Sequence, residues 1–504
     1  MMDSLRSTLA GTLEVQPSCD GAELSVLPPD VDWLEVRADL VGELDPDWLR
    51  ARFAGKLLYS LRSTAEGGRA PSAIADRRER LIHASRGYDL VDLEGARDLV
   101  PDVLAAIGPE GRVVSWRGPA EELSTLEARF EKISSTPARL YRLVSTGERI
   151  DDALASLALL NRLGRADTIA YASGPLGFWT RLIAPLVGYP ITFGGIQQID
   201  SERGEPSVFR LIKDYGRPRL TPVKELFGIL GSRAYHSRSP ELHNAAYRDL
   251  GIPALFVPFP IDSFDAFWTR VVDADELRRI GISLNGLTIA SPFKEEALLR
   301  ASAISPMARR AGSTNVVIRS PSGWRAETTD SDGAVPLLQE RRISIARQRA
   351  AVVGCGGSGR VVAASLQVAG ADVTLVNRGL MRGRRAVELL GMPFVPLADF
   401  SVNGYSLIVN ATPVGTEPGE MPFQVDRLEE HAAVVDHVCS ATSTSLMAAT
   451  RALGCVAIEG RDILLAQVRR QFQRMLGREM PLVPLTGLAG STSFEAAAVG
   501  LARD

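Results

Sequence analysis

The sequence has little that would mark a metalloprotein, a disulfide scaffold or a membrane protein. Its four cysteines (Cys19, Cys355, Cys439 and Cys455) are far apart, and none has the paired spacing that holds zinc or builds a disulfide framework. No run of about 18 uncharged apolar residues occurs, and nothing indicates export. A net charge of −3 gives no electrostatic reason to bind nucleic acid or an anionic membrane. We therefore expect a cytoplasmic protein with small-molecule partners and no metal, nucleic acid or membrane partner.

What the sequence does have is a repeated alternation of strand and helix patterns. At 504 residues it is too long for one core, and usual domain sizes favour about three domains. Up to about residue 212, eight β-rich runs alternate with helical stretches, which predicts a (β/α)8 barrel; an open α/β sheet is the alternative. Residues 213–226, with two prolines and a glycine among several charges, are typical of a linker. The eight runs are TLEVQ, DWLEVRA, KLLYSLR, YDLVDLE, RVVSWR, RLYRLVS, TIAYAS and PITFGGI.

A glycine-rich turn at residues 352–360, VVGCGGSGR, follows a strand pattern and opens a helical one. Gly354, Gly356 and Gly359 form a complete G-x-G-x-x-G, with Gly357 and Ser358 between them. The first glycine allows the tight turn, the second lets the backbone approach a pyrophosphate, and the helix N-terminus favours negative charge. The segment predicts a dinucleotide-binding domain, and these five residues are its candidate cofactor contacts.

The end of the next strand indicates which dinucleotide is bound. An NAD enzyme places an acidic side chain there for the ribose hydroxyls, whereas this chain has Asn377 and Arg378, followed by Arg382. The two arginines favour the 2′-phosphate of NADP. The alternative is that they are surface arginines on a loop.

Motifs on both sides of this turn carry a resemblance over roughly residues 227 to 480. The first is S-x-S-P-x-x-H-N, read here as SRSPELHN from Ser237 to Asn244. With the motifs that follow it in order, the region resembles the shikimate dehydrogenase family. These are GLTIASPFK ending in Lys294, GSTN with Asn315, TTDSDG with Asp330, NAT, VVD, and GRDILLAQ with Gln467.

The resemblance implies roles for individual residues. Lys294 beside Asp330 would hydrogen-bond the hydroxyl that becomes a carbonyl and move its proton as hydride leaves; a surface salt bridge is the alternative for such a pair. Ser237 and Ser239 would clamp a substrate carboxylate, although two serines also cap helices. Further implied contacts are Ala290, Asn315 and Gln467 for the substrate, and Val438 and Gly460 for the cofactor.

Three positions depart from the motifs of that family. Ala290 stands where a substrate-contacting threonine is usual, Thr328 replaces the asparagine of N-T-D, and Cys439 replaces the tyrosine of V-Y. Each change removes or shortens a polar contact, and a lost hydrogen bond is worth about 0.5–1.5 kcal/mol. We therefore expect the preference among shikimate, quinate and related acids to differ from the usual one.

The first half of the chain, over most of residues 8 to 212, resembles type I 3-dehydroquinate dehydratase. That family is a barrel enzyme of the preceding pathway step and is fused to shikimate dehydrogenase in plants. The matching motifs are EVRAD with Glu35 and Arg37, SLRSTAEGG with Arg62 and Glu66, VDLE with Glu94, and GPLGFWTR with Arg181.

Two residues that this family needs for catalysis are replaced by arginine. Its Schiff-base lysine belongs in the sixth strand, where this chain has Arg142, and its histidine belongs in the fifth, where this chain has Arg117. Up to residue 212 the lysines are Lys56 and Lys132 and the histidine is His83, at a strand start or in helical stretches. Because a guanidinium stays protonated, it is a poor nucleophile toward a carbonyl. We expect covalent dehydration to be absent.

The charged residues left at the barrel mouth have two interpretations. They form a self-satisfied ion network, or they line a pocket for a small carboxylate, since buried charges need partners in either case. The candidate barrel-ligand residues are Glu35, Arg37, Arg62, Glu66, Glu94, Arg117, Arg142 and Arg181.

The expected architecture is α/β, with a TIM barrel at 1–212, a linker at 213–226 and a substrate-binding domain at 227–333. A Rossmann domain at 334–466 binds NADP, and residues from about 467 to 504 complete the substrate domain. The expected function is an NADP-dependent shikimate dehydrogenase of aromatic amino acid biosynthesis, fused to a barrel that is inactive in covalent dehydration. The alternatives are a fully bifunctional enzyme and a non-catalytic sensor of quinate or shikimate.

Overall fold

The computed structural model describes residues 5–70, 74–197, 204–220, 223–440 and 442–481. The chain forms two compact units, Met1–Asn285 and Gly286–Asp504. The tail from 482 to 504, part of the segment expected to complete the substrate domain, lies outside the described residues.

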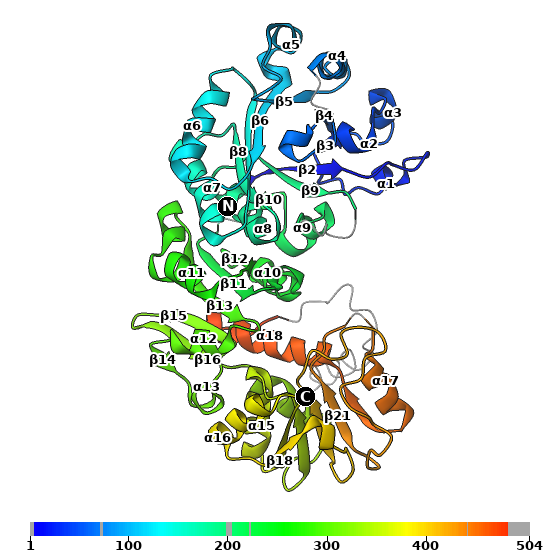
Figure 1. Cartoon of the computed structure of the whole chain (residues 1–504), viewed down its shortest axis with the longest axis vertical. Helices are drawn as coiled ribbons and strands as arrows, with labels where there is room; N and C mark the ends of the chain where they lie inside the picture. The colour runs from blue at the N-terminus through cyan, green and yellow to red at the C-terminus, as the bar shows by residue number, and fades with distance from the viewer. Residues whose placement is uncertain (1–4, 71–73, 198–203, 221–222, 441, 482–504) are drawn as a thin grey trace. The chain divides into compact units, whose positions relative to one another are not determined.

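Eight parallel strands in the first unit form a nearly closed barrel, which confirms the predicted fold of this half (Figure 1). They are β2 (Thr8–Leu13), β3 (Trp33–Arg37), β4 (Lys56–Ser60), β5 (Leu90–Glu94), β6 (Arg112–Gly118), β7 (Leu140–Thr146), β8 (Thr168–Ser173) and β9 (Ile191–Gly195). Each strand from β2 to β7 pairs with the next, and β2 also pairs with β9. The helices between them are α1 (Ala22–Ser25), α2 (Ala38–Val41), α3 (Pro46–Arg50), α4 (Ile74–Ala84), α5 (Pro101–Ala106), α6 (Leu123–Ser134), α7 (Ile150–Leu163) and α8 (Phe178–Ile183).

The first barrel strand begins earlier than the sequence predicts. We expected it at residues 12–16, TLEVQ, but β2 is Thr8–Leu13. Leu9 and Leu13 are buried, whereas Val15 is 57% exposed. A strand of a parallel barrel is buried on both faces, so its sequence lacks the alternation that would have marked its ends.

The inside of the barrel has an apolar layer and, nearer the carboxyl ends of the strands, a polar layer. Residues two apart on a strand point to the same face, so the two layers follow one another along each strand. The apolar layer is Ala10, Trp33, Leu58, Leu90, Val113, Leu140, Ile169 and Ile191. Two residues further on, the buried side chains are Thr12, Glu35, Ser60, Asp92, Ser115, Arg142, Tyr171 and Phe193. The carboxyl ends of the strands form the mouth where barrel enzymes carry their sites.

The first unit continues beyond the barrel. The predicted linker contains the end of helix α9 (Val208–Tyr215) and strand β10 (Arg219–Leu220), which pairs with β1 (Leu5–Arg6). Next come β11 (Glu225–Gly231) and β12 (Ala254–Pro260), which pair in parallel, with α10 (Ser239–Asp249) between them and α11 (Phe264–Phe267) after them. The barrel packs on this part through buried aromatic rings, since the Trp179 and Phe259 rings are 5.3 Å apart.

The second unit begins with a mixed group of strands. Strand β13 (Ser283–Ile289) pairs antiparallel with β15 (Val316–Ser320), which pairs antiparallel with β16 (Gly323–Glu327). Short β14 (Ala303–Ile304) runs parallel to β16. The associated helices are α12 (Lys294–Leu299), α13 (Pro306–Ala311), α14 (Ser331–Glu340) and α18 (Gly460–Leu476).

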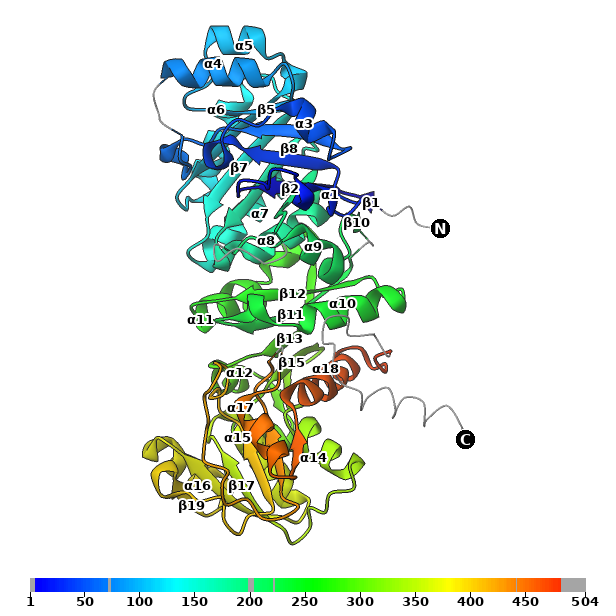
Figure 2. The ribbon, with the colours of Figure 1, turned by 90° about the vertical axis from the view of Figure 1, so that its right-hand side faces the viewer.

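A six-stranded parallel sheet follows in the same unit, and Figure 2 labels its strands β17 and β19. The strand order is β19-β18-β17-β20-β21-β22. This is the strand order of a Rossmann fold, whose cofactor crevice lies where the order reverses, beside β17. Alternate residues of β17 face opposite layers: Ala350 and Val352 pack with α14, α15 and α16, and Ala351 and Val353 pack with α17. The elements are β17 (Arg349–Val353), α15 (Gly357–Val368), β18 (Asp372–Asn377), α16 (Leu380–Leu390), β19 (Phe394–Pro396), β20 (Leu407–Asn410), β21 (Ala433–Asp436), α17 (Ser445–Ala452) and β22 (Val456–Ile458).

The described residues contain neither a membrane-spanning helix nor a cluster of metal ligands. None of the described helices combines the length and the apolar character that crossing a bilayer requires. Within the same residues, no three histidine, cysteine or acidic side chains gather in a way that could hold a metal ion.

Candidate active site

Lys294 and Asp330 form a buried ion pair in the second unit. Lys294 is the first residue of α12, and Asp330 lies between β16 and α14. The Lys294 Nζ is 2.7 Å from Asp330 Oδ2 and 2.6 Å from Ser358 Oγ, at the start of α15. The two side chains are 11% and 4% exposed, so this is not a surface salt bridge.

The second carboxylate oxygen of Asp330 accepts hydrogen bonds from two further predicted residues. Asn315 Nδ2 donates to Asp330 Oδ1 at 3.0 Å, and Gln467 Nε2 donates to the same atom at 3.2 Å. Asn315 is itself fixed, because its Oδ1 accepts from the Thr329 amide at 2.7 Å. Lys294, Asn315 and Gln467 thus meet at one carboxylate, whose orientation they hold.

Local backbone features bring these residues together. The β15–β16 pairing sets Val316 opposite Glu327, so Asn315 and Asp330 emerge at the same end of the hairpin. Gln467 reaches Asp330 because α18 crosses α14 closely at Gly333. A Cβ at Gly333 would lie 2.7 Å from the Ile463 side chain.

The glycine turn after β17 has the geometry that pyrophosphate binding needs. Gly354 has a φ of +110°, which favours glycine, and a Cβ at Gly359 would lie 1.8 Å from the Gly354 carbonyl oxygen. A Cβ at Gly357 would meet the Ser313 hydroxyl at 2.3 Å, whereas one at Gly356 would have nothing within 4 Å. The turn is therefore tight at three glycines and open at Gly356, where a phosphate can approach the backbone.

The predicted nucleotide-selecting residues lie next to this turn. Asn377 Oδ1 accepts from the Cys355 amide at 3.0 Å and so anchors the turn to β18. Arg378 and Arg382 are exposed. Burial raises the pKa of the Cys355 thiol to about 11, while Arg360 and Arg382 act to lower it, which places Arg382 near the turn.

A further residue at this edge of the sheet, His437, escaped the sequence prediction. It directly follows β21 and precedes Val438, whose carbonyl oxygen would lie 2.2 Å from a Cβ at Gly460. Burial, and secondarily the charge of Lys294, lower the pKa of His437 to about 4 although Asp330 acts to raise it. Its Nε2 has no hydrogen-bond partner among the described residues, so a neutral imidazole nitrogen is available beside the pair. The only sequence feature that could have indicated His437 is its position directly after the VVD motif.

The two predicted clamp serines lie in the first unit, at the start of α10. Ser237 Oγ accepts from the Ser239 amide at 3.2 Å, which resembles the helix-start contact foreseen as an alternative. An accepting hydroxyl keeps its own O–H for a ligand, so this contact is compatible with a clamp. Ala290 lies in the second unit, in the loop before α12, and brings no polar group.

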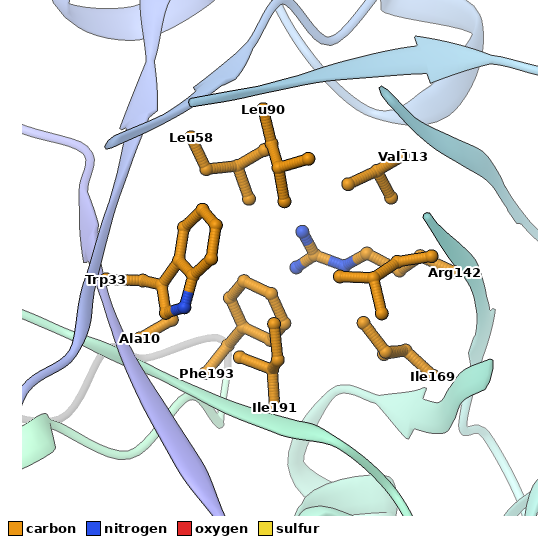
Figure 3. Close-up of a pocket in the computed structure, with 10 residues that line it drawn as sticks. Ala10, Trp33, Leu58, Leu90, Val113, Arg142, Ile169, Ile191 and Phe193 are labelled. Carbon is orange, nitrogen blue, oxygen red and sulfur yellow. The ribbon is translucent and has the colours of Figure 1, made fainter. Parts of the chain in front are cut away.

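In the barrel, the Arg142 side chain points into the interior, toward Phe193 (Figure 3). It pairs there with Glu35. Arg142 Nη1 donates to Glu35 Oε1 at 2.6 Å, and Nη2 donates to the Tyr171 hydroxyl at 3.2 Å. The guanidinium carbon lies 3.9 Å from the centroid of the Phe193 ring. Burial acts to raise the pKa of Glu35, but the charge of Arg142 opposes burial, and the pKa is lowered to about 2. The Arg142 guanidinium therefore has a buried carboxylate partner, although its Nε has no hydrogen-bond partner among the described residues.

The space beside Arg142 in the apolar layer is too small for an organic ligand. It is lined by the apolar layer together with Arg142 and Phe193 and measures about 10 Å³ (Figure 3). That volume is comparable with the minimum for a single water molecule. A ligand of this barrel has to bind on the mouth side of Arg142.

Arg117, one strand away, is paired with a different carboxylate. Its Nη2 donates to Asp92 Oδ2 at 2.6 Å and its Nη1 donates to Ser115 Oγ at 2.9 Å. The Arg117 amide donates to Glu66 Oε2 at 3.1 Å. Burial raises the pKa of Glu66 to about 8, although Arg117 acts to lower it.

Two other mouth arginines are also paired, and one predicted acid belongs elsewhere. Arg37 lies 2.7 Å from Glu14 and 2.8 Å from Asp39, and Arg181 lies 2.6 Å from Glu205. Glu94 instead accepts from Ser63 and pairs with Arg77 and Arg97, away from these arginines. Sequence reasoning missed the partners Glu14, Asp39, Asp92, Tyr171 and Glu205, of which only Asp39 and Asp92 lie in recognised motifs.

Arg62 differs from the other arginines of the mouth. Within the part of the chain that the structure describes, its guanidinium forms no ion pair, and its buried Nε has no hydrogen-bond partner. Burial, followed by the charges of Arg117 and Arg37, lowers the pKa of Arg62 to about 9. The residue is partly exposed, so this cation is open to a ligand from solvent.

Comparison with known proteins places both halves in families. A family model described as type I 3-dehydroquinase matches residues 21–215, and one described as shikimate dehydrogenase substrate binding domain matches residues 229–317. The bifunctional 3-dehydroquinate dehydratase/shikimate dehydrogenase of Arabidopsis thaliana, a chloroplastic protein, is 24% identical over 489 residues, covering 89% of this chain and 79% of that one.

Relatives of the second half alone are more similar. The shikimate dehydrogenase (NADP(+)) of Halobacterium salinarum is 33% identical over 265 residues, covering 52% of this chain and 97% of its own. The crystal structure of shikimate 5-dehydrogenase from Thermus thermophilus, in complex with NADP(H) and shikimate, matches with 29% identity and a TM-score of 0.46, covering 51% of this chain and 95% of that one. This chain belongs to the shikimate dehydrogenase family and carries a type I 3-dehydroquinase domain in front of its dehydrogenase region.

Proposed function

We propose that this protein is an NADP-dependent dehydrogenase that interconverts shikimate and 3-dehydroshikimate. The observation that carries the proposal is the buried Lys294–Asp330 pair, held by Asn315 and Gln467 beside the glycine turn. The name of the Halobacterium relative supports both the cofactor and the reaction. In this proposal Ser237 and Ser239 bind the substrate carboxylate.

The residues of the Rossmann sheet fit an NADP molecule. Gly356 leaves room for the pyrophosphate at the N-terminus of α15. Arg378, just after β18, and Arg382, at the start of α16, are exposed near the place where a 2′-phosphate is recognised. When bound, NADP accepts or supplies the hydride.

The protein's own contribution is to manage a proton. Lys294 Nζ donates a hydrogen bond to the oxygen of the reacting carbon, and its proton passes to that oxygen as the ketone is reduced. Asp330 orients the ammonium through its 2.7 Å contact, and Asn315 and Gln467 prevent the carboxylate from rotating. Shikimate oxidation uses the same atoms in reverse.

The test is a direct assay of the full chain. We expect shikimate to reduce NADP, measured as absorbance at 340 nm, with a lower rate when NAD replaces NADP at the same concentration. Quinate is the comparison substrate, because Ala290, Thr328 and Cys439 remove polar contacts usual in this family. No NADP reduction with either acid would overturn the proposal and favour the sensor alternative.

For the barrel we propose a small-carboxylate site without covalent chemistry. The observation that favours it is Arg62, which forms no ion pair within the described residues and lies near Arg117 and Arg37, although the charge of Glu35 also acts on it. A buried or half-buried cation without a counter-charge is unfavourable, so an anion that reaches Arg62 is stabilised. Arg142 and Arg117 are already paired with Glu35 and Asp92, and neither can form a Schiff base.

We expect dehydroquinate to bind to the full chain without conversion. Borohydride treatment should leave no adduct in an intact-mass spectrum, and calorimetric titration should show binding that Arg62→Ala weakens about tenfold to a hundredfold, since hydrogen bonds to charged groups are worth about 1.5–3 kcal/mol. Arg50→Ala is the matched control, because Arg50 forms a half-exposed pair with Asp89 elsewhere on the barrel. A borohydride-stable adduct on the barrel would instead establish the bifunctional alternative.

Several finer expectations belong to the same proposal. They are the four-part division with boundaries at 212, 226, 333 and 466, a cytoplasmic location, and the absence of a nucleic-acid partner. The slight net negative charge and the four free cysteines support the last two.

A further inference from the structure

The last barrel helix, α9, contacts the segment that carries the clamp serines. Arg210 Nη2 donates a hydrogen bond to the backbone carbonyl of Tyr235, two residues before Ser237. Arg210 is held in place from the barrel side. Its Nε donates to Asp214 Oδ2 at 3.2 Å, and its guanidinium carbon lies 5.3 Å from the centroid of the Phe178 ring on α8.

A second contact lies on the other side of the serines. Lys213 Nζ on α9 is 2.8 Å from Glu241 Oε1, in the first turn of α10. The other oxygen of Glu241 is 2.7 Å from Arg238 Nη2, and the Glu241 side chain is 8% exposed. A chain of three charges thus ties the start of α10 to the barrel, and the two attachments bracket Ser237 and Ser239.

Polar contacts, more than close packing, hold this segment against α9. A groove of about 320 Å³ remains between them, lined by residues of α9 and by residues 236, 237, 238 and 241. Further away the junction is tightly packed, with Trp179 and Phe259 in contact and both fully buried. The barrel is therefore a rigid support. The contacts of Arg210 with Tyr235 and of Lys213 with Glu241 hold residues 235–241 in position relative to it.

We propose that the barrel acts as a scaffold for the dehydrogenase, with Arg210 and Lys213 as positioning residues for the Ser237–Ser239 carboxylate clamp. Hydroxyl donors bind a carboxylate well only when their backbone holds them in the bound geometry beforehand. This role needs no catalysis in the barrel, which gives a reason to keep a domain whose reaction is lost. The inference rests on the proposed dehydrogenase function.

The test uses the full chain with Arg210→Ala and Lys213→Ala, assayed with shikimate and NADP varied separately. The clamp holds a part of the substrate that does not react, so its loss raises KM and spares kcat. We expect KM for shikimate to rise about tenfold, or ~1.4 kcal/mol, with kcat and KM for NADP within about threefold of the parent. Lys213→Arg, which keeps the charge, should restore a KM near that of the parent.

Arg162→Ala is the matched control, because Arg162 forms a 2.8 Å pair with Glu127 on the barrel surface. It should leave every kinetic constant unchanged. Because Lys213 is 45% exposed, we expect Lys213→Ala to fold. This variant tests the positioning role if Arg210→Ala does not fold. An unchanged KM for shikimate in an active Lys213→Ala chain overturns the inference, as does an equal rise in KM for NADP. An inactive parent chain overturns the proposed function instead, so the two failures are distinguishable.

Discussion

Replacing Lys294 with methionine is expected to lower kcat for shikimate oxidation by about 10²–10⁴-fold, the usual contribution of a positioned proton donor or acceptor. Methionine has a similar volume but no ionisable proton to donate. Asp330 keeps the hydrogen bonds from Asn315 and Gln467, so the site should stay folded. The measurement is steady-state NADP reduction, together with the dissociation constant of NADP by fluorescence titration, which should change little.

The matched control for this variant is Lys224→Met, because Lys224 is an exposed lysine in the first unit. It should retain the parent kcat. A Lys294→Met chain with kcat within tenfold of the parent would show that another group moves the proton. His437, with its unpartnered Nε2, would then be the first residue to examine.

Replacing Arg142 with methionine is expected to destabilise the barrel by about 3–5 kcal/mol, because it leaves the Glu35 carboxylate buried without its counter-charge. For a domain of about 200 residues this lowers Tm by roughly 10 °C. Thermal unfolding followed by circular dichroism measures it. Arg50→Met, at a half-exposed pair with Asp89, is the control and should cost less than about 1 kcal/mol. Equal losses in the two variants would contradict the prediction.

The same variant should show a distinctive pH dependence. In the parent, the Glu35 pKa of about 2 lies below the ordinary value of 4.5, so its stabilising contribution is present above about pH 4.5 and is lost as pH falls through about 2. Without Arg142 the largest charge that lowers the Glu35 pKa is lost, while Arg62 and Arg117 remain, so that pKa rises from its value in the parent. The deficit is then largest at neutral pH and shrinks when Glu35 is protonated. The double variant Glu35→Leu with Arg142→Met should be more stable than Arg142→Met alone, since no charge is then buried.

Sequence patterns predicted the fold where periodicity and motifs agreed. All eight predicted barrel strands overlap strands of the structure, but the first shares only Thr12 and Leu13 with β2, because the apolar residue Val15 lies on the surface. Leu140 and Arg142 share a face, as alternation along a strand requires, since both line the interior space. Such local rules need only neighbouring residues.

Long-range pairing was beyond those rules. Nothing near Arg142 in the sequence indicates Glu35, which is 107 positions away, or Tyr171. Likewise, Lys213 lies in a segment whose composition is typical of a linker, and only the structure reveals that it ends a helix in contact with Glu241. The motif residues around Asp330 could be predicted as a group only because the family resemblance assigns all of them to one site. Their spacing in the sequence does not.

The ion pair between β3 and β7 also bears on how the barrel folds. Glu35 and Arg142 belong to opposite sides of the ring, so a half-formed barrel that has buried one of them carries an isolated charge in an apolar setting. Such partial structures have a higher free energy until the strands of both halves of the ring are in place. The paired guanidinium therefore makes assembly of this ring more nearly all-or-none, and a pair that forms last also adds to the barrier that keeps the ring closed.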